Sequence, residues 1–188
     1  MAGMAVRDIE TEAKWRSDEQ GHLRLRRALR RLGGVHVVTV REANTIFDTP
    51  GNALKRGGHI LRLRSLDGVG TILTFKGPAA YRDGMKTREE TELHVEDRDA
   101  MAAVLSGLGF NASLEYRKTR ETWDLDGARV ALDTLEFGRF AEIEGTEDQI
   151  RRAAGLLSLD LGKAEKKGYP ALMRAYQERG RAAREQAE

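Results

Sequence analysis

Charged side chains recur at every second position in several short segments of this chain. In the first of these segments Glu10, Glu12 and Lys14 alternate with Thr11 and Ala13. Such alternation is typical of a β-strand, in which successive side chains point to opposite faces, so each segment has one charged and one less polar face. The charged faces together carry seven acidic and six basic residues: Glu10, Glu12, Glu90, Glu92, Asp133, Glu142, Glu144, Lys14, Arg62, Arg64, Lys76, Lys118 and Arg120.

Two helical segments indicate which of these faces is covered. Apolar residues recur at helical spacing in residues 25–32 and 101–108, a pattern typical of amphipathic helices that pack on an apolar surface. If these helices cover the apolar faces of the strands, the charged faces point inward when the sheet closes. The sequence therefore predicts a barrel with a charged interior.

A charged interior of this kind favours one class of ligand. Ion pairs buried among themselves seldom recover the cost of removing both charges from water. A water-filled tunnel that binds a polyanion on its basic residues and divalent cations on its carboxylates would use both sets of charges. Oxygen-only ligands select Mg²⁺ or Mn²⁺. The pattern thus indicates an oligophosphate substrate and phosphoryl transfer.

The elements that would position these residues follow from periodicity and turn signals. Hairpin signals at Leu66–Gly70 and at Asp126-Gly127 favour antiparallel pairing. We predict an α+β fold, mainly antiparallel, with about eight strands in a closed barrel and flanking helices. The expected strands cover residues 9–15, 35–40, 42–47, 60–65, 71–76, 86–95, 114–125, 129–135 and 137–145; the expected helices cover 18–32, 97–108, 147–157 and a last one from residue 169.

Length and composition limit the remaining classes. The chain has 188 residues, which predicts a single domain, residues 1–178, followed by a helical tail, residues 179–188, that frays at its end. It has no cysteine, so disulfides, thiolate metal sites and cysteine nucleophiles are excluded. No signal-peptide core or membrane-length apolar run is visible, so we expect a cytoplasmic protein without a membrane partner.

Beyond this pattern, Glu10–Lys14 resembles the ExExK signature of the CYTH, or triphosphate tunnel metalloenzyme, superfamily. That family includes class IV adenylate cyclases, thiamine triphosphatases and inorganic triphosphatases. The resemblance covers residues 9–176. It continues in order through residues 47–50 (FDTP), 61–64 (LRLR), 74–78 (TFKGP), 88–92 (REETE), 118–120 (KTR), 132–133 (LD) and 138–144 (GRFAEIE).

The resemblance implies an eight-stranded antiparallel tunnel that requires Mg²⁺ or Mn²⁺, and it implies roles for single residues. Glu10 and Glu12 resemble the metal-binding pair of the first strand, and Glu142 and Glu144 the pair of the closing strand, with Asp133 as a metal or water ligand. The remaining implied residues are Lys14, Arg62, Arg64, Lys76, Arg120 and, more weakly, Lys118 as triphosphate ligands, and Glu90 and Glu92 near the metal ligands without direct contact.

Some positions depart from the family pattern. Residues 42–47 (EANTIF) stand where many members have Gln-x-Asp-x-Tyr-Phe, and no His-Phe pair precedes ExExK as it does in class IV cyclases. Gly168-Tyr169 replaces a Ser-Tyr pair, and Lys163, Lys166 and Lys167 lie nearby in the sequence as outer phosphate contacts.

Three functions remain open at this level. The first is a metal-dependent triphosphatase, acting on inorganic triphosphate, thiamine triphosphate or a nucleoside triphosphate. The second is an adenylate cyclase that forms cyclic AMP and pyrophosphate from ATP. The third, more remote, is a polyphosphate- or RNA-binding module, suggested by the arginine-rich residues 24–31, although nucleic acid is disfavoured because aromatic residues make up only 6% of the chain.

A few features are assigned ordinary roles. Trp15 and Trp123 lie opposite the charged faces and are expected to pack in the core. The four histidines share no metal-ligand spacing. Residues 79–86 could form either a lid or a plain surface loop. A homodimer is plausible for the family.

Overall fold

The computed structural model describes residues 6–185. Its strands are β1 (Val6–Ser17), β2 (Val35–Asp48), β3 (Ile60–Leu66), β4 (Gly70–Lys76), β5 (Ala80–Arg82), β6 (Met85–Val95), β7 (Asn111–Leu125), β8 (Ala128–Leu135) and β9 (Gly138–Glu144). Its helices are α1 (Glu19–Arg31), α2 (Ala53–Arg56), α3 (Arg98–Gly107), α4 (Glu147–Leu156), the short 3-10 helix η1 (Leu161–Lys163) and α5 (Tyr169–Glu185).

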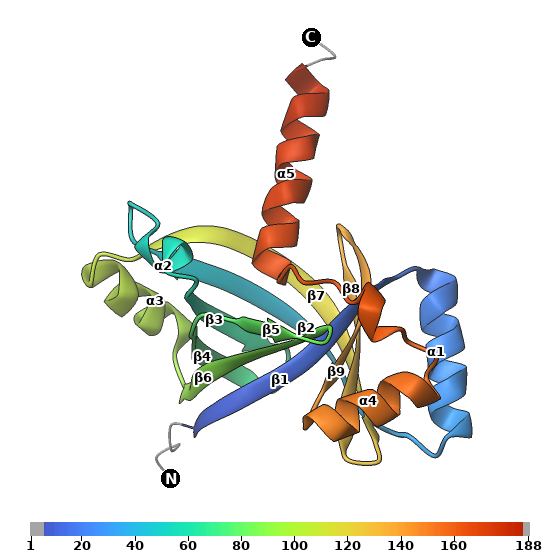
Figure 1. The fold of residues 1–188 in the computed structure, drawn as a ribbon. Helices are drawn as coiled ribbons and strands as arrows, with labels where there is room; N and C mark the ends of the chain where they lie inside the picture. The colour runs from blue at the N-terminus through green and yellow to red at the C-terminus, as the bar shows by residue number, and fades with distance from the viewer. Residues whose placement is uncertain (1–5, 186–188) are drawn as a thin grey trace.

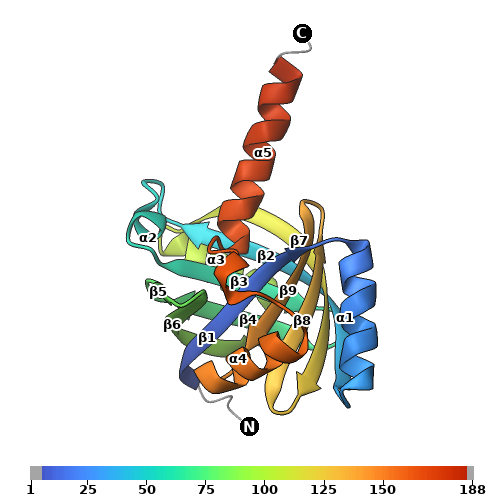
Figure 2. The same ribbon diagram turned by 45° about the vertical axis from the view of Figure 1, so that its right-hand side comes forward.

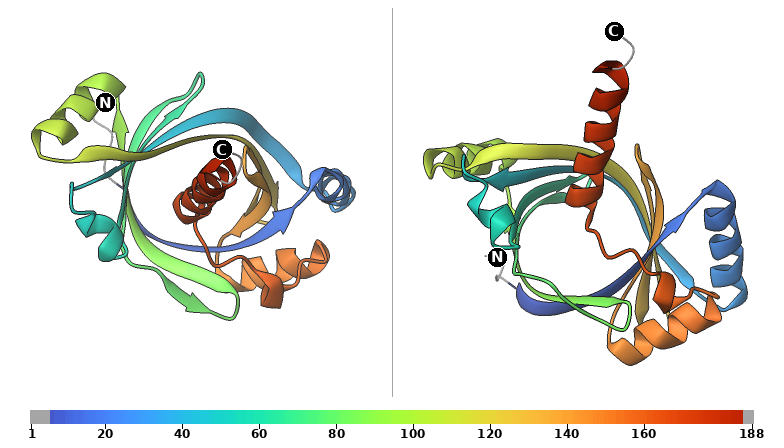
Figure 3. Two further views of the ribbon diagram at one scale, coloured as in Figure 1. Left: turned by 90° about the horizontal axis from the view of Figure 1, so that it is seen from above. Right: turned by 45° about the horizontal axis from the view of Figure 1, so that its top comes forward.

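Eight of the strands form a closed antiparallel barrel. They follow the order β1-β9-β8-β7-β2-β3-β4-β6, and pairing of β1 with β6 closes the ring, while β5 adds a short strand at the edge of β6. Seen from above, the strands surround an opening, and α5 stands over it (Figure 3). The predicted fold class is therefore confirmed, with one strand more than expected.

Helices α1, α3 and α4 lie against the outside of the barrel, as the charge pattern predicted, whereas α5 stands at one end of it (Figures 1 and 2). The largest apolar cluster joins α1 and α4 to the outer faces of β1, β8 and β9, and it contains Trp15, Trp123 and Leu29. A second cluster lies under α3, and a third holds the first turns of α5 against β7. Both tryptophans are thus core residues, as expected.

Local signals fix where three of the helices begin. Asp18 accepts a hydrogen bond from the backbone N–H of Gly21 at 2.6 Å, and Asp97 accepts from the N–H groups of Asp99 and Ala100. Thr146 forms a capping box at the start of α4. Side chains of this type satisfy N–H groups that the first helical turn leaves unpaired.

His22 links α1 to the sheet. It is 1% exposed, and its Nε2 lies 3.0 Å from the carbonyl oxygen of Phe140 in β9. Burial lowers the pKa of His22, and the nearby Arg26 lowers it further, although the hydrogen bond to Phe140 opposes this shift. The ring is therefore a neutral packing group, in keeping with the ordinary role expected for the histidines.

The structure corrects three expectations about the elements. Residues 35–40 and 42–47 form one continuous strand, because Val40, Arg41 and Glu42 pair without interruption with consecutive residues of β7. Residues 79–86 form the β5–β6 hairpin rather than an open loop. Gly84 is required in its turn, where φ is +78° and an added Cβ would lie 2.1 Å from the carbonyl oxygen of Leu161. The sequence analysis also missed the short helix α2.

The expected C-terminal tail is helical over the residues that the structure describes. Residues 179–185 continue α5 without interruption, and residues 186–188 of the expected tail lie outside the described part. Within residues 6–185, none of the helices combines the length and apolar character needed to span a membrane.

Candidate metal and polyanion site

The barrel encloses a cavity of about 710 Å³ whose wall is mostly charged. That volume lies within the range of small-molecule sites, roughly 300–1,000 Å³. Every strand of the barrel that carries an alternating charge pattern turns its charged face toward the interior. The predicted site residues that line it are Glu10, Glu12, Lys14, Arg62, Arg64, Lys76, Glu90, Glu92, Lys118, Arg120, Glu142 and Glu144.

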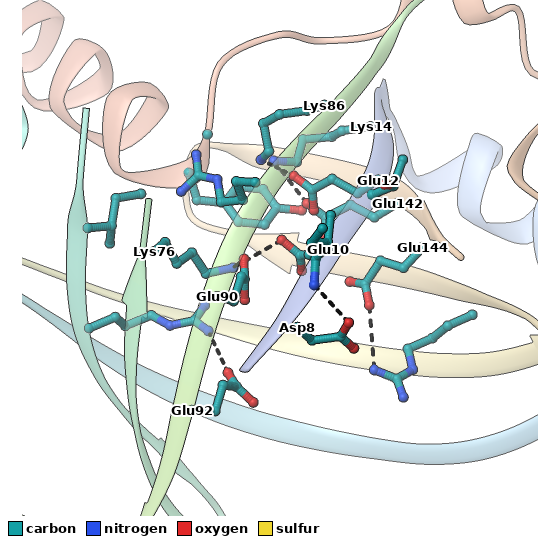
Figure 4. Close-up of a pocket in the computed structure, with 18 of the residues that line it drawn as sticks. Asp8, Glu10, Glu12, Lys14, Lys76, Lys86, Glu90, Glu92, Glu142 and Glu144 are labelled. Atoms are coloured by element: carbon teal, nitrogen blue, oxygen red, sulfur yellow. Dashed lines mark hydrogen bonds and ion pairs between the residues drawn. The ribbon is translucent and has the colours of Figure 1, made fainter. Parts of the chain in front are cut away.

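Three carboxylates converge on one side of this cavity (Figure 4). One oxygen each of Glu10, Glu12 and Glu144 lies within 4.8 Å of the others. Alternation along β1 supplies the first two, and antiparallel pairing of β1 with β9 places Glu144 directly opposite Glu12. We call these three residues the carboxylate trio.

The trio is held by cations of the chain itself. Lys86 contacts Glu12, Lys76 lies 3.2 Å from Glu10, and Arg120 lies 3.3 Å from Glu144. Burial raises the pKa of Glu144, and the neighbouring Glu10 raises it further. In Glu10 burial acts in the same direction, but Lys76, a hydrogen bond with Glu90 and Lys86 together outweigh it, so the pKa of Glu10 is lowered.

The donor set of the trio fits a hard divalent cation. All three ligands are carboxylate oxygens, the type that Mg²⁺ and Mn²⁺ prefer. Three carboxylates this close repel one another, and a divalent cation would relieve that repulsion. The residues present are therefore able to hold such an ion.

Asp133 and Glu142, also expected as metal ligands, lie in a different environment. Asp133 is fully buried and does not line the cavity; it accepts hydrogen bonds from Lys118 at 3.1 Å, Arg120 at 2.6 Å and the Tyr169 hydroxyl at 2.7 Å. Glu142 lies 2.9 Å from Lys14 and also contacts Arg120. We call Asp133, Glu142 and these cations the sealed network.

The pKa values of these two carboxyl groups differ from those in the trio. Burial would favour their neutral forms, but Arg120 and Lys118 hold the pKa of Asp133 below its usual value. Lys14 and Arg120 likewise hold the pKa of Glu142 well below its usual range. Both groups therefore remain charged and fully paired with cations of the chain.

Cations on β3 and β4 line the same cavity, and one of them, Lys76, reaches the trio at Glu10. Arg64 lies 3.4 Å from Glu92 and Arg62 lies 3.7 Å from it, while Lys76 contacts Glu90 as well as Glu10. Burial raises the pKa of Glu90 to about 8, with a hydrogen bond to Glu10 as the next cause. Burial and the neighbouring Glu10 thus favour the protonated form of Glu90.

The sequence analysis missed several residues of the site. Lys86 and Arg88 face inward with Glu90 and Glu92 on β6, and extending that alternation two steps toward the N-terminus would have found them. Glu42 was treated only as a departure from a motif. It is 2% exposed and lies 3.6 Å from Lys118. No charged neighbour at even spacing on β2 marked Glu42 in advance.

Comparison with known proteins places the chain in a family. The CYTH domain model matches residues 8–169. The chain belongs to the CYTH family. Members of this family are divalent-metal-dependent enzymes, triphosphatases or adenylate cyclases, so the charged barrel and its carboxylate trio belong to an enzyme fold.

The chain is similar to a curated relative and to two solved structures. The "putative adenylate cyclase" MJ0240 of Methanocaldococcus jannaschii is 29% identical over 137 residues, which is 72% of this chain and 76% of the relative. A solved structure from Vibrio parahaemolyticus, also described as a "putative adenylate cyclase", has a TM-score of 0.75 with 22% identity over 89% of this chain and 98% of its own.

The second solved structure comes from Hippeastrum and is described as a "putative adenylyl cyclase" that reveals a dominant triphosphatase activity. Its TM-score is 0.72 with 23% identity, over 88% of this chain and 95% of its own. At these identities the two solved structures show the shared fold.

Proposed function

We propose that this CYTH protein is a divalent-metal-dependent triphosphatase that hydrolyses the terminal phosphoanhydride bond of a triphosphate. The observation that carries the proposal is the carboxylate trio, within 4.8 Å, in one cavity with the cations of β3 and β4. A triphosphate has several charged phosphate groups in a row, so it matches an extended line of cations better than a single anion does.

The metal would be Mg²⁺ or Mn²⁺, held by Glu10, Glu12 and Glu144. When bound there it would neutralise charge on phosphate oxygens and polarise the bond that breaks. This assignment uses three of the five carboxylates that the sequence suggested as ligands. Asp133 and Glu142 instead orient Lys14, Lys118 and Arg120 toward the substrate.

The chain's own cations would bind and orient the triphosphate. Arg62, Arg64 and Lys76 line the cavity and are paired there with Glu90 and Glu92, which a triphosphate can replace as partners. In hydrolysis a water oxygen bonds to the terminal phosphorus as the water loses a proton to the solvent. The anhydride bond to that phosphorus breaks, and the developing negative charge passes to the leaving phosphate oxygen. Fixed cations beside that oxygen stabilise the charge as it develops.

An adenylate cyclase is the alternative that shares the same site. The name of the Methanocaldococcus relative supports it, and so does a cavity of about 710 Å³, which leaves room beside a triphosphate for a nucleoside. In that reaction the 3′-hydroxyl oxygen of ATP attacks the α-phosphorus and pyrophosphate leaves. The two reactions differ in which phosphorus lies beside the trio.

For the polyphosphate- or RNA-binding alternative, the arginine-rich helix α1 gives little support. Arg26 lies 2.7 Å from Glu121, and Arg30 lies over the ring of Trp123. These two side chains are engaged in packing the helix on the barrel rather than presented to a partner.

Product analysis separates the two enzymatic reactions. The protein is incubated with tripolyphosphate, thiamine triphosphate or ATP, each with Mg²⁺, Mn²⁺ or a chelator, and the products are identified by phosphorus NMR. Metal-dependent orthophosphate, lost in Glu10→Gln and retained in the exposed control Glu96→Gln, supports the triphosphatase. Cyclic AMP with pyrophosphate from ATP would establish the cyclase instead, and no turnover of any substrate would refute both.

A further inference from the structure

Every carboxylate of the trio already has a cationic partner from the chain. Lys86 contacts Glu12, Lys76 contacts Glu10, and Glu144 pairs with Arg120 at 3.3 Å and Arg129 at 3.5 Å. A divalent cation cannot take these oxygens as ligands while ammonium and guanidinium groups occupy the same positions. Metal binding must therefore displace cations of the chain.

Lys86 is the cation best placed for such an exchange. It lies directly opposite Glu12 in the β1–β6 pairing, its side chain is 13% exposed, and it lines the cavity (Figure 4). Lys76 and Arg120 each have further carboxylate partners, Glu90 for the lysine and Asp133 and Glu142 for the arginine. Those partners would keep Lys76 and Arg120 in place after the trio had taken up a metal.

We propose that Lys86 occupies the metal position on Glu12 in the ligand-free protein and transfers to the triphosphate when a divalent cation binds. The inference rests on the proposed metal and polyanion site. Its basis is the contact between the flexible Lys86 ammonium and one member of a three-carboxylate cluster, beside Lys76 and Arg120, which have second carboxylate partners. Lys86 acts as a positioning residue and takes no part in bond breaking.

This exchange predicts opposite effects of Lys86 on the two ligands. Lys86 competes with the metal for Glu12, so it weakens metal binding in the absence of a polyanion. Once released, the same ammonium binds phosphate oxygens, so it strengthens polyanion binding. Metal and triphosphate therefore assist one another, and by linkage each raises the affinity of the other by the same factor.

The test measures binding without turnover. Calorimetric titrations with Mn²⁺ alone, and with diimidotriphosphate alone in chelator, are made on the wild type and on Lys86→Gln. We expect Lys86→Gln to bind Mn²⁺ about tenfold more tightly and diimidotriphosphate about tenfold more weakly, the size of a lost contact between charged groups. The exposed control Lys55→Gln, with the same change in net charge, should bind both as the wild type does.

Two outcomes overturn different parts of the argument. If the wild type binds Mn²⁺ and Lys86→Gln has the same Mn²⁺ affinity as Lys55→Gln, the role of Lys86 is wrong and the metal site stands. If the wild type binds no Mn²⁺ with or without diimidotriphosphate, the proposed metal site fails, and the exchange fails with it.

A measurement on the unaltered protein guards against misfolding of the variant. Reductive methylation followed by mass spectrometry reports how available the Lys86 amine is. Mn²⁺ alone should increase methylation of Lys86 because the metal releases it from Glu12, and adding diimidotriphosphate should reduce methylation again. Unchanged or decreased methylation with Mn²⁺ alone would contradict the exchange.

Discussion

The carboxylate trio and the sealed network both hold acidic groups inside the barrel, but these groups differ in exposure and in the number of their partners. Members of the trio lie on the cavity wall, and Glu12 and Glu144 remain 8% and 15% exposed in their side chains. Asp133 in the sealed network is completely buried, and its two oxygens accept hydrogen bonds from three side chains. One region has carboxylates whose partners a ligand can replace, and the other has carboxylates whose partners are fixed.

The contrast shows that position in a charged barrel does not by itself make a carboxylate a ligand. A buried carboxylate that is fully paired with cations and a hydroxyl has no lone pair aimed at the cavity, and removing it leaves buried cations uncompensated. A carboxylate crowded by like charges gains when a divalent cation arrives. We therefore expect substitution of Asp133, which does not line the cavity, to affect mainly stability, and substitutions in the trio to affect ligand binding and turnover.

Asp133→Asn should have the largest effect. It leaves Lys118 and Arg120 buried with one charged partner fewer, and breaking one side of a buried ion pair costs about 3–5 kcal/mol. Urea denaturation followed by circular dichroism measures the free energy of unfolding. A loss below about 1 kcal/mol, together with loss of Mn²⁺ binding, would instead place Asp133 among the metal ligands.

Glu10→Gln should have the reverse profile. Removing one charged group that acts on the reacting phosphate costs about 10²–10³-fold in turnover, while the free energy of unfolding should change by no more than about 1 kcal/mol because a half-buried surface of the cavity can be rehydrated. Orthophosphate release measures the first effect and urea denaturation the second. A large loss of stability with little loss of turnover would reverse the assignment of the two regions.

The two regions also differ in how far the sequence predicted them. Alternation in β1 and β9 predicted that Glu10, Glu12 and Glu144 face the interior, because inward or outward orientation follows directly from a period of two. The closed barrel was predicted for the same reason, together with the hairpin signals at Leu66–Gly70 and Asp126-Gly127.

Depth along the barrel could not be predicted in this way. Glu142 and Glu144 face the same interior and lie two residues apart on β9. The register with β1 nevertheless places Glu142 opposite Lys14 and Glu144 opposite Glu12. Asp133 meets the Tyr169 hydroxyl, 36 positions away, only because α5 begins over the barrel opening. Such contacts depend on strand stagger and on loop paths, which local periodicity does not encode.

Mn²⁺ should stabilise the protein through the trio. A ligand that binds only the folded state at a hundred times its dissociation constant adds about 2.7 kcal/mol. The melting temperature should therefore rise with Mn²⁺ in the wild type and in the control Glu96→Gln, and much less in Glu12→Gln. An equal rise in all three proteins would show that the ion binds outside the trio.

The smallest expected effect is the contribution of His22 to the pH dependence of stability. His22 contacts the carbonyl oxygen of Phe140, and Phe140 pairs with Asp133 of the sealed network across β9 and β8. Burial lowers the pKa of His22 in the folded protein from its usual 6.5. Below pH 6.5 the unfolded chain therefore takes up a proton that the folded protein refuses, so the stability present above this pH is lost as the pH falls through the folded pKa.

In His22→Gln the amide can still donate a hydrogen bond to the Phe140 carbonyl, but it does not titrate. The free energy of unfolding should therefore fall less steeply between pH 7.5 and 5.5. The difference in slope is at most that of one proton, about 1.4 kcal/mol per pH unit. Urea denaturation at pH 7.5, 6.5 and 5.5 measures this slope. Identical slopes in the wild type and the variant would contradict the lowered pKa of His22. They would mean that water reaches its ring between α1 and β9.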